Sequence, residues 1–377
     1  MPRNDIRRSK RGMLRTIGLL AIAATFATGL AASSAGETFA AQTKSFQSLG
    51  QMPGSALGTV VDGISGDGST IAGYGNICTT FNPNGSCLTA GADQAFRWTP
   101  ADGYQMLGSP GSTAFYGAGA VNYDGSVIVG EHPPLNGNGY SAFRWTAATG
   151  MTQLPLNIAT AVTPDGGMVA GFDNWWKTTG ETGTFGPFPG FPDQTEAEGL
   201  AGTAQTPVAV GSAIKGSDAF GPTDHAFRWT PTTGLQDLGL VPGGDQSIGI
   251  AISADEDVVV GEAQVGGFWR AFRWTAKTGM VDLGTLGGPE SAAFATNKDG
   301  SVIVGASLTS QSTGSSVAFR WTATSGMQAV GKLVNVPEHL ILQSALGISA
   351  DGTVITGNGR NLRLGIDEPW RAVLPVR

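Results

Sequence analysis

The strongest constraint on the fold is an internal repeat. The pentapeptide Ala-Phe-Arg-Trp-Thr occurs five times, at residues 95–99, 142–146, 226–230, 271–275 and 318–322. Upstream of it runs a β-branched segment that closes in glycine, at Gly73, Gly130, Gly171, Gly211, Gly261, Gly305 and Gly357. Six residues before these glycines stand Asp67, Asp124, Asp165, Gln205, Asp255, Asp299 and Asp351. The fixed offset defines a repeat of about 47 residues, a period typical of propeller blades.

Each repeat divides into four short strands. They are a strand of small residues (a), a β-branched strand such as "VIVG" (b), the pentapeptide (c) and a strand such as "MVDLG" (d). The Asp-Gly pair between a and b is a two-residue hairpin signal, because glycine tolerates positive φ. With no helical periodicity, this pattern predicts an all-β fold, a β-propeller of about seven four-stranded blades. The expected blades are 51–108, 109–155, 156–193, 194–239, 240–284, 285–331, and 332–377 together with 43–50.

The chain ends predict how the ring closes. The last repeat ends in "EPWRAVLPVR", which supplies a strand c with Trp370 and Arg371 in the Phe and Arg places but no strand d. Residues 43–50, "TKSFQSLG", resemble a strand d. Pairing the two segments would complete the last blade and remove an exposed sheet edge. The third repeat shows no clear strand c, so a ring of six blades with one irregular insertion stays open as an alternative.

Two interpretations of the pentapeptide compete, a repeated site and a fold element. In a strand, Phe and Trp lie on one face and Ala, Arg and Thr on the other. Both faces of a blade lose water, and truncating a buried aromatic costs about 3–5 kcal/mol. Because a fold element recurs and an active site does not, we interpret the motif as structural, and we expect each arginine to meet a carbonyl or carboxylate of its own or the adjacent blade. The structural residues are Phe96, Arg97, Trp98, Phe143, Arg144, Trp145, Phe227, Arg228, Trp229, Phe272, Arg273, Trp274, Phe319, Arg320 and Trp321.

With these motifs in place, the chain resembles the HAF-repeat family of bacterial extracellular repeat proteins. The unit of that family carries an H-A-F-x-W core followed by a Gly turn and L-G-x-L-G-G. Residues 224–239, "DHAFRWTPTTGLQDLG", and 271–288, "AFRWTAKTGMVDLGTLGG", are similar to it. Where His225 stands, the other copies have Gln94, Ser141, Arg270 and Val317. The resemblance covers most of residues 43–377 and implies an exported repeat protein; it transfers no catalytic residue.

The N-terminus predicts export. Six basic residues precede an Ala- and Leu-rich stretch without charges, and Ser33-Ser34-Ala35 offers a small-residue cleavage site. This is the pattern of a signal peptide over residues 1–35, followed by a short linker at 36–42 and a single domain at 43–377. We expect no stable membrane anchor after cleavage and a protein in the periplasm or outside the cell. Removal of the segment leaves 16 Lys and Arg against 28 Asp and Glu, a net charge of −12, which disfavours nucleic acid as a partner.

The two cysteines, Cys78 and Cys87, lie in one predicted loop, "NICTTFNPNGSC". In an oxidising compartment a close pair without further metal ligands predicts a local disulfide.

No motif in the sequence predicts catalysis. His132, His225 and His339 lie far apart in the sequence, and no G-x-S-x-G, H-E-x-x-H or P-loop pattern occurs. Asp255 and Asp257 alone are too few for a calcium site. We therefore expect no catalytic residues, no metal and no cofactor.

The connections between strands b and c vary most in length, over 74–94, 131–141, 172–190, 212–225, 262–270, 306–317 and 358–369. They should emerge on one face, where a rigid scaffold would present diverse loops to a ligand. The third loop gathers aromatics, and Trp175, Trp176, Phe185 and Phe188 are candidate ligand contacts; a small core under a long loop is the alternative. The sequence thus predicts a secreted, monomeric binding module for a protein or glycan. The alternative is a carbohydrate-active hydrolase or lyase with acidic residues on the same loops.

Overall fold

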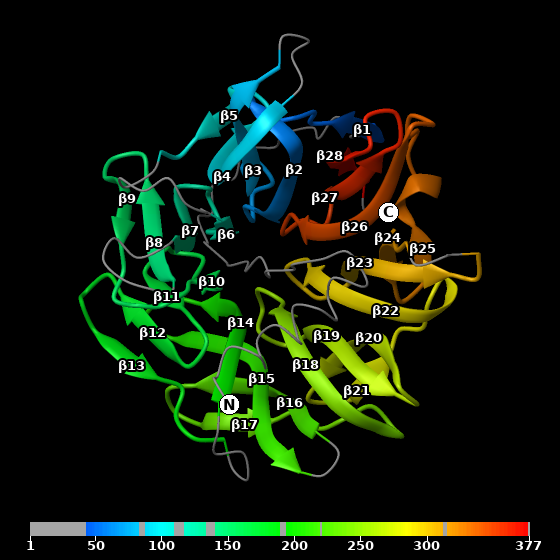
Figure 1. Cartoon of the computed structure of the whole chain (residues 1–377). Helices are drawn as coiled ribbons and strands as arrows, with labels where there is room; N and C mark the ends of the chain where they lie inside the picture. The colour runs from blue at the N-terminus through cyan, green and yellow to red at the C-terminus, as the bar shows by residue number, and fades with distance from the viewer. Residues whose placement is uncertain are drawn as a thin grey trace, which may run out of the picture.

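The computed structural model describes residues 43–82, 87–108, 117–132, 140–188, 194–218, 221–311 and 315–375. The described chain is built of β-strands with one short 3₁₀ helix, η1 (Val330–Lys332). The sheets follow one another around a ring, with the blue start and the red end of the chain side by side (Figure 1). The predicted β-propeller is confirmed.

Five sheets have four strands each, in which strands neighbouring in sequence pair antiparallel. The first three are β6 (Gly117–Val121), β7 (Val127–His132), β8 (Ser141–Thr146) and β9 (Gly150–Gln153); β10 (Ala161–Val162), β11 (Met168–Ala170), β12 (Asn174–Lys177) and β13 (Thr182–Thr184); and β14 (Gln194–Gly202), β15 (Pro207–Asp218), β16 (Gly221–Thr230) and β17 (Gly234–Asp237). The other two are β18 (Gly244–Ile252), β19 (Val259–Val265), β20 (Phe268–Thr275) and β21 (Gly279–Asp282); and β22 (Gly287–Thr296), β23 (Val302–Thr309), β24 (Val317–Thr322) and β25 (Gly326–Ala329).

The remaining sheet joins the two ends of the chain. It contains β26 (Leu340–Ile348), β27 (Val354–Asn361), β28 (Ile366–Val373), β1 (Ser45–Ser48), β2 (Ser55–Ile64), β3 (Ile71–Phe81), β4 (Cys87–Thr99) and β5 (Gly103–Met106). β1 pairs antiparallel with β28 from Ser45 opposite Val373 to Ser48 opposite Trp370. This is the register in which β9 pairs with β8, so the predicted closure by the N-terminal strand is confirmed.

The a–b turns explain the recurring aspartate. In the first repeat, the Ser65 N–H donates to the Thr70 carbonyl and the Gly68 N–H donates to the Ser65 carbonyl, at 2.8 and 2.9 Å. The loop therefore holds four residues, not the two that the sequence predicts, and within it the Asp67 carboxylate accepts the Ser69 N–H at 2.9 Å. The same contact, from the N–H two residues further on, recurs at Asp124, Asp165, Asp255, Asp299 and Asp351.

Hydrogen bonds between neighbouring a–b turns link them on one face of the ring, the turn face. Backbone N–H groups donate to backbone carbonyls from Asp67 to Tyr123, Tyr123 to Pro164, Asp255 to Lys298, Lys298 to Ala350 and Ala350 to Gly66. The Ala204 N–H donates to the Asp165 carboxylate at 3.0 Å. The last of these backbone bonds joins the final repeat to the first, so the turns close the ring independently of β1.

Buried apolar clusters fill the seams between neighbouring four-stranded groups. In the seam before β6–β9, Phe143 and Trp145 pack against Ala72 and Leu107, which belong to the preceding group. Ala142 lies on the opposite face, in the next seam. The alternation that the pentapeptide predicts is thus confirmed. The aromatics pack in the seam with the preceding blade, and the alanine packs in the seam with the following blade.

The number of blades stays a prediction. The paired strands form six sheets, but the eight-stranded sheet is joined between β2 and β28 by a single parallel contact, Gly58 with Asp367. Divided there, the described strands make seven four-stranded groups, and seven buried apolar clusters lie between them. Both observations favour the predicted count of seven over six.

The third repeat differs from its prediction. Residues 172–190 do not form a b–c loop, because β12 begins at Asn174 and β13 at Thr182. The Gly171 N–H donates to the Asn174 carbonyl at 2.8 Å, and only three residues, 171–173, connect β11 to β12. Trp175 lies opposite Ala170 and Trp176 opposite Val169, the places that Arg144 and Trp145 take against β7. The strand c that the sequence did not reveal is present, with Trp175 in the arginine place.

Candidate functional site

The turn face is occupied by contacts that hold the scaffold together. The threonine that ends the pentapeptide binds within its own c–d turn: Thr146 contacts Thr149, and Thr275 contacts Thr278, both at 2.7 Å between hydroxyl oxygens. Arginines of strand c reach the a–b turn of the next blade. Arg144 Nη2 donates to the Gly166 carbonyl at 3.4 Å, and Arg273 Nε donates to the Gly300 carbonyl at 3.3 Å.

The contacts of three other arginines in strand c differ from these. Arg97 Nη1 lies 4.0 Å from Asp102 in its own blade, as the sequence prediction allowed. Burial lowers the pKa of Arg320 and Arg371, and their predicted partners stay predictions. The contacts of Arg97, Arg144 and Arg273 favour the interpretation of the pentapeptide as a fold element.

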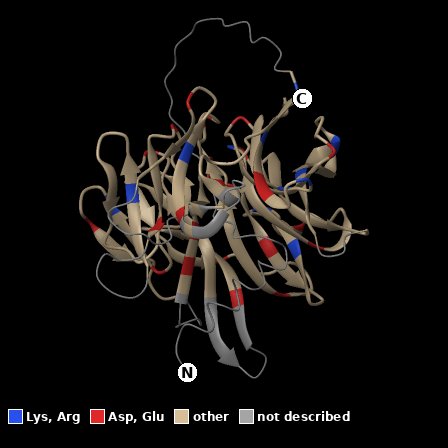
Figure 2. Cartoon of the chain, turned by 45° about the horizontal axis from the view of Figure 1, so that its top comes forward, with Lys and Arg blue, Asp and Glu red and all other residues tan. Residues whose placement is uncertain are grey.

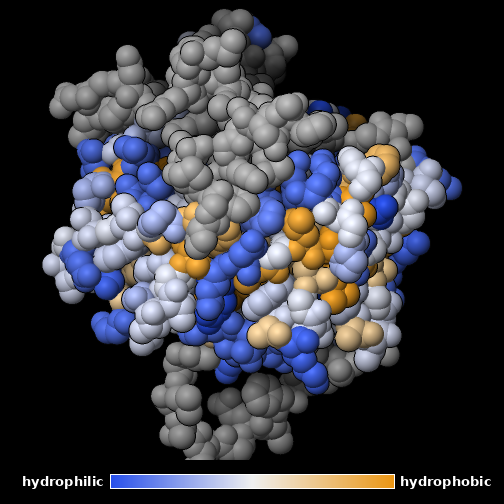
Figure 3. All heavy atoms as spheres, turned by 90° about the horizontal axis from the view of Figure 1, so that it is seen from below, coloured by the Kyte–Doolittle hydropathy of each residue, from blue (hydrophilic) through white to orange (hydrophobic). Residues whose placement is uncertain are grey.

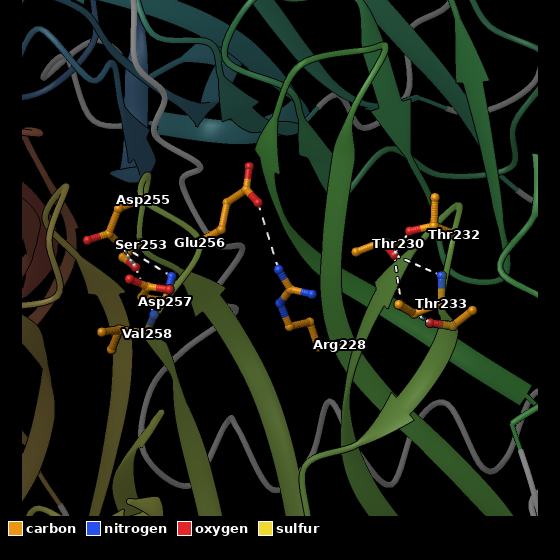
Figure 4. A network of polar contacts seen from close by, with 10 residues as sticks. Arg228, Thr230, Thr232, Thr233, Ser253, Asp255, Glu256, Asp257 and Val258 are labelled. Carbon is orange, nitrogen blue, oxygen red and sulfur yellow. Dashed lines mark hydrogen bonds and ion pairs between the residues drawn. The ribbon is translucent and has the colours of Figure 1, made fainter. Parts of the chain in front are cut away.

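Two turns lack the usual glycine: Thr206 stands at this place in the fourth repeat and Glu256 in the fifth, where the third and sixth carry Gly166 and Gly300. The φ of 69° at Glu256 is the one positive value at a non-glycine among the described residues. Its carboxylate faces Arg228 of the preceding blade, with 3.7 Å between Oε2 and Nη2 (Figure 4). Burial raises the pKa of Glu256, and the Arg228 charge opposes this shift. An ion pair links the two blades here, whereas other neighbouring a–b turns are linked by backbone hydrogen bonds or, between Ala204 and Asp165, by a backbone N–H and a carboxylate.

The predicted aromatic site is part of the core. Trp175, Phe185 and Phe188 are buried, and the Phe185 ring lies edge-on to Trp229 with 5.2 Å between centroids. Trp176 is half-buried and packs against the neighbouring cluster. These side chains pack in the seams of the third blade, which favours the alternative that the sequence analysis left open, and their contact with a ligand stays a prediction.

The opposite face, the loop face, carries the b–c hairpins. Their strands run to different distances past the closing glycine: β3 ends eight residues beyond Gly73 and β15 seven beyond Gly211, whereas β7 ends two beyond Gly130. In extended strands eight residues span about 26 Å. The predicted diversity of the b–c connections is therefore built largely from strand extension rather than from irregular loop.

The longest hairpin, β3–β4, has its own internal bonds. Asn76 Nδ2 donates to Asp93 Oδ1 at 3.0 Å. Burial raises the pKa of Asp93, and this hydrogen bond opposes the shift. Cys78 lies opposite Ala90 and Cys87 opposite Phe81 in the strand register. The Cys87 side chain lies outside the described part of the structure, so the disulfide stays a prediction.

Carboxyl groups gather in the seams below the loop face. Glu262 on β19 is 6% exposed, and burial, followed by the charges of Glu290 on β22 and Asp224 on β16, raises its pKa to about 8. Three consecutive blades contribute to this cluster, which separated repeats of the sequence do not reveal. A protonated carboxyl beside two others has the ionisation of a general acid, but the Glu262 side chain is shielded from solvent.

A second carboxyl pair lies between the first two blades. Burial, together with the charge of Glu131 on β7, raises the pKa of Asp62 well above its ordinary value. Asp62 and Glu131 are 3% and 4% exposed. Both carboxyl groups of this second pair are therefore shielded from solvent.

Within the described ranges, no group of three or more His, Cys, Asp or Glu side chains could hold a metal ion. His225 contacts Asp237 at 3.0 Å, far in the fold from His132 and His339, which lie on or beside other sheets.

Acidic and basic residues are spread over several sheets (Figure 2). On the side of the ring at the bottom of Figure 1, hydrophobic residues reach the surface in separate groups between hydrophilic ones (Figure 3). No helix in the described ranges is long and apolar enough to cross a membrane.

Comparison with known proteins supports the fold. No family model matches the chain, and no curated protein matches its sequence. Among solved structures, the chain is similar to the β-propeller domain of the Trilobed protease from Pyrococcus furiosus, with a TM-score of 0.54 and 8% identity over 84% of this chain and 94% of that one.

Two lyases show a similar likeness. The chain matches oligogalacturonate lyase from Vibrio parahaemolyticus with a TM-score of 0.52 and 9% identity, over 89% of this chain and 98% of that one. It matches virginiamycin B lyase from Staphylococcus aureus with a TM-score of 0.50 and 13% identity, over 88% and 100%. The class defined by fold and comparison is the β-propeller proteins, and identities this low extend to the fold alone.

Proposed function

We propose that the protein is an exported, non-enzymatic binding scaffold that meets a protein or glycan with its loop face. The observation that carries this proposal is the difference between the two faces of the ring: one is built from repeated contacts and the other from hairpins of different length. Threonine, arginine and aspartate of the repeat are used in turn-face contacts. The b–c hairpins, by contrast, differ in length from blade to blade on an otherwise regular ring. A rigid scaffold with variable projections is a common architecture of binding proteins.

The buried state of the carboxyls supports binding over catalysis. Asp62, Glu131 and Glu262 are each less than one-tenth exposed. Glycoside cleavage needs two carboxyl groups that flank a bound sugar, and cleavage by proton abstraction needs a base that reaches its substrate. These groups meet one another inside seams instead.

The proposed function is tested by binding of the exported chain to glycan and protein arrays. A variant with the β3–β4 hairpin shortened to the length of β7–β8 removes the largest projection, and Thr278→Ala on the turn face is its matched control. We expect ligands of the wild type to bind the control equally and at least one of a series of hairpin-shortened variants weakly. Ligands that bind every shortened hairpin variant as tightly as the wild type would contradict the proposal.

One observation favours the enzyme alternative, the raised pKa of Glu262. Incubation with acidic and neutral polysaccharides, followed by reducing-end and unsaturated-product assays, tests it. Cleavage by the wild type that Glu262→Gln abolishes would replace the scaffold proposal with a carbohydrate-active enzyme.

The proposal also includes export of the protein and its membership of the HAF-repeat family. Residues 1–42 lie outside the described part of the structure, so the signal peptide rests on the sequence. N-terminal sequencing of the protein recovered from the periplasm or the medium should begin close to Gly36. A protein retained in the cytoplasm with Met1 or Met13 at its start would contradict export.

A further inference from the structure

The hairpin between β27 and β28 ends in a tip of defined conformation on the loop face. Asn361 is the residue that shapes it: its Oδ1 accepts the backbone N–H groups of Arg363 and Leu364 at 3.0 and 3.1 Å. Its carbonyl accepts the Gly365 N–H at 2.8 Å. The Leu362 N–H is held by the carbonyl of His339 at 2.7 Å. The backbone N–H of every tip residue from 362 to 365 thus donates a hydrogen bond, either to a backbone carbonyl or to the Asn361 side chain.

This tip is tied to the closure of the ring through buried polar groups. Asn361 is 5% exposed, and its Nδ2 donates to Glu368 Oε2 at 2.7 Å. The other carboxylate oxygen of Glu368, which is also 5% exposed, accepts the hydroxyl of Ser48 on β1. A continuous chain of hydrogen bonds therefore runs from the N-terminal strand to the tip, and the tip is ordered before any ligand arrives.

What the tip presents is apolar. Leu364 and Leu362 are 62% and 58% exposed, the two highest values among the large hydrophobic side chains of the described residues. Ile341, 39% exposed, lies beside them because it pairs with Arg360, the residue before Asn361. A tip that served only to close a hairpin would not need leucines: the β19–β20 hairpin closes with Gly266 and Gly267.

The charges at the tip are not equivalent. Arg360 is paired with Asp367 at 2.9 Å. Arg363, between the two leucines, is exposed and forms no ion pair with a described residue. A positive charge thus stands free between two apolar side chains, in a chain whose exported part carries a net charge of −12 by sequence.

We propose that Leu362, Arg363 and Leu364 form an anchor that inserts into an apolar pocket bordered by carboxylates on a protein partner. The inference rests on the proposed binding function and names the contact it uses. Fixing the anchor in advance lowers the entropic cost of association, and exposed apolar side chains that enter a pocket are typical interface hot spots. The free guanidinium between them calls for acidic groups at the rim of that pocket.

A membrane is a less suitable partner for this anchor than a protein. Two leucines supply little insertion energy, and the acidic chain as a whole is repelled by anionic lipid. A protein pocket requires only local complementarity with Arg363.

The test selects random peptides displayed on phage against the immobilised full chain. We expect enriched peptides to combine Leu, Phe or Trp with Asp or Glu. Leu362→Ser and Leu364→Ser should each weaken their binding about tenfold, Arg363→Glu should weaken it, and Arg363→Lys should retain it. Met106→Ser is the matched control, because Met106 is 54% exposed on β5, away from the tip. All of these side chains are exposed, so thermal unfolding should be unchanged.

Peptides that bind the Leu362→Ser/Leu364→Ser variant as tightly as the wild type would overturn the anchor. If such peptides lose affinity when another b–c hairpin is shortened, the proposed loop-face function stands without it. If the binding of every peptide, glycan and array protein is unchanged by shortening any hairpin, both the anchor and the proposed loop-face function are contradicted. Binding of the wild type, but not of the double variant, to phosphatidylglycerol vesicles would replace the protein partner with a membrane.

Discussion

Arg228 and Glu256 form an ion pair across a joint of the turn face, with 3.7 Å between Nη2 and Oε2. At the three joints on the C-terminal side of it, neighbouring a–b turns are linked by backbone hydrogen bonds. Glu256 occupies a left-handed backbone conformation that favours glycine, at a cost of about 1–2 kcal/mol. The contact between β14–β17 and β18–β21 on the turn face therefore includes a pair of opposite side-chain charges.

This difference predicts that the stabilisation contributed by the Arg228–Glu256 contact depends on salt concentration. Replacing Arg228 by alanine should lower the free energy of unfolding by about 1 kcal/mol or less at low salt, because both partners are partly exposed. The cost should shrink in about 1 M NaCl, which screens the pair. The matched control is Arg273→Ala, which removes a hydrogen bond to the uncharged Gly300 carbonyl.

Urea unfolding of both variants at low and high salt measures this. The control should lower stability by a similar amount at both salt concentrations. An equal salt dependence for Arg228→Ala and Arg273→Ala would show that the Glu256 charge does not hold the joint.

Glu262 predicts how stability depends on pH. Its pKa is raised from 4.5 to about 8 by burial and by Glu290 and Asp224, so the folded protein holds this proton more tightly than the unfolded chain does. The contribution to stability is complete below pH 4.5 and is lost as the pH rises through 8. Ionisation at higher pH places a charge in a seam beside two other carboxylates.

Glu262→Gln should remove this loss. We expect the variant to match the wild type near pH 4.5 and to exceed it near pH 9, by on the order of a few kcal/mol. Urea unfolding over this pH range gives the slope, and the exposed Glu338→Gln is the control. A variant whose stability falls with pH as steeply as that of the wild type would show that other groups govern the dependence.

The regular parts of the fold could be predicted from the sequence because each repeat carries its own local signals. The register of β1 against β28 follows from a single incomplete strand set, Trp370 and Arg371 without a strand d. The direction of Arg144 and Arg273 follows from alternation along a strand and from the cost of an unpaired charge.

Other features depend on contacts between repeats, which one sequence does not show. Trp175 takes the place of an arginine, so the third strand c lacked its motif. The cluster around Glu262 brings together residues from three blades, and their contact does not follow from the repeated position of Glu262, directly after Gly261 as Glu131 stands after Gly130. Asn361 looks like an ordinary turn residue until its bonds to Arg363, Leu364 and Glu368 are seen together.

The predicted disulfide can be tested directly. Cys78 and Cys87 lie on paired strands, each a few residues from the end of the β3–β4 hairpin. We expect mass spectrometry after alkylation without reductant to find both thiols blocked in the exported protein and both alkylated after reduction. Alkylation of both cysteines before reduction would show that no disulfide joins the two strands of the hairpin.

The closing strand predicts a further difference between two neighbouring residues. Ser48 donates to the buried carboxylate of Glu368, whereas Gln47 points outward from the same strand. Ser48→Ala leaves a buried carboxylate oxygen without this donor and should lower stability by about 1–3 kcal/mol, while Gln47→Ala should change it by less than about 0.5 kcal/mol. Thermal unfolding monitored by near-ultraviolet circular dichroism reports the change, because Trp370 stacks on Phe46 of β1 with 6.4 Å between ring centroids. Equal melting temperatures for the two variants would show that the hydroxyl does not hold β1, and that the ring is closed by backbone pairing and the turn-face hydrogen bonds.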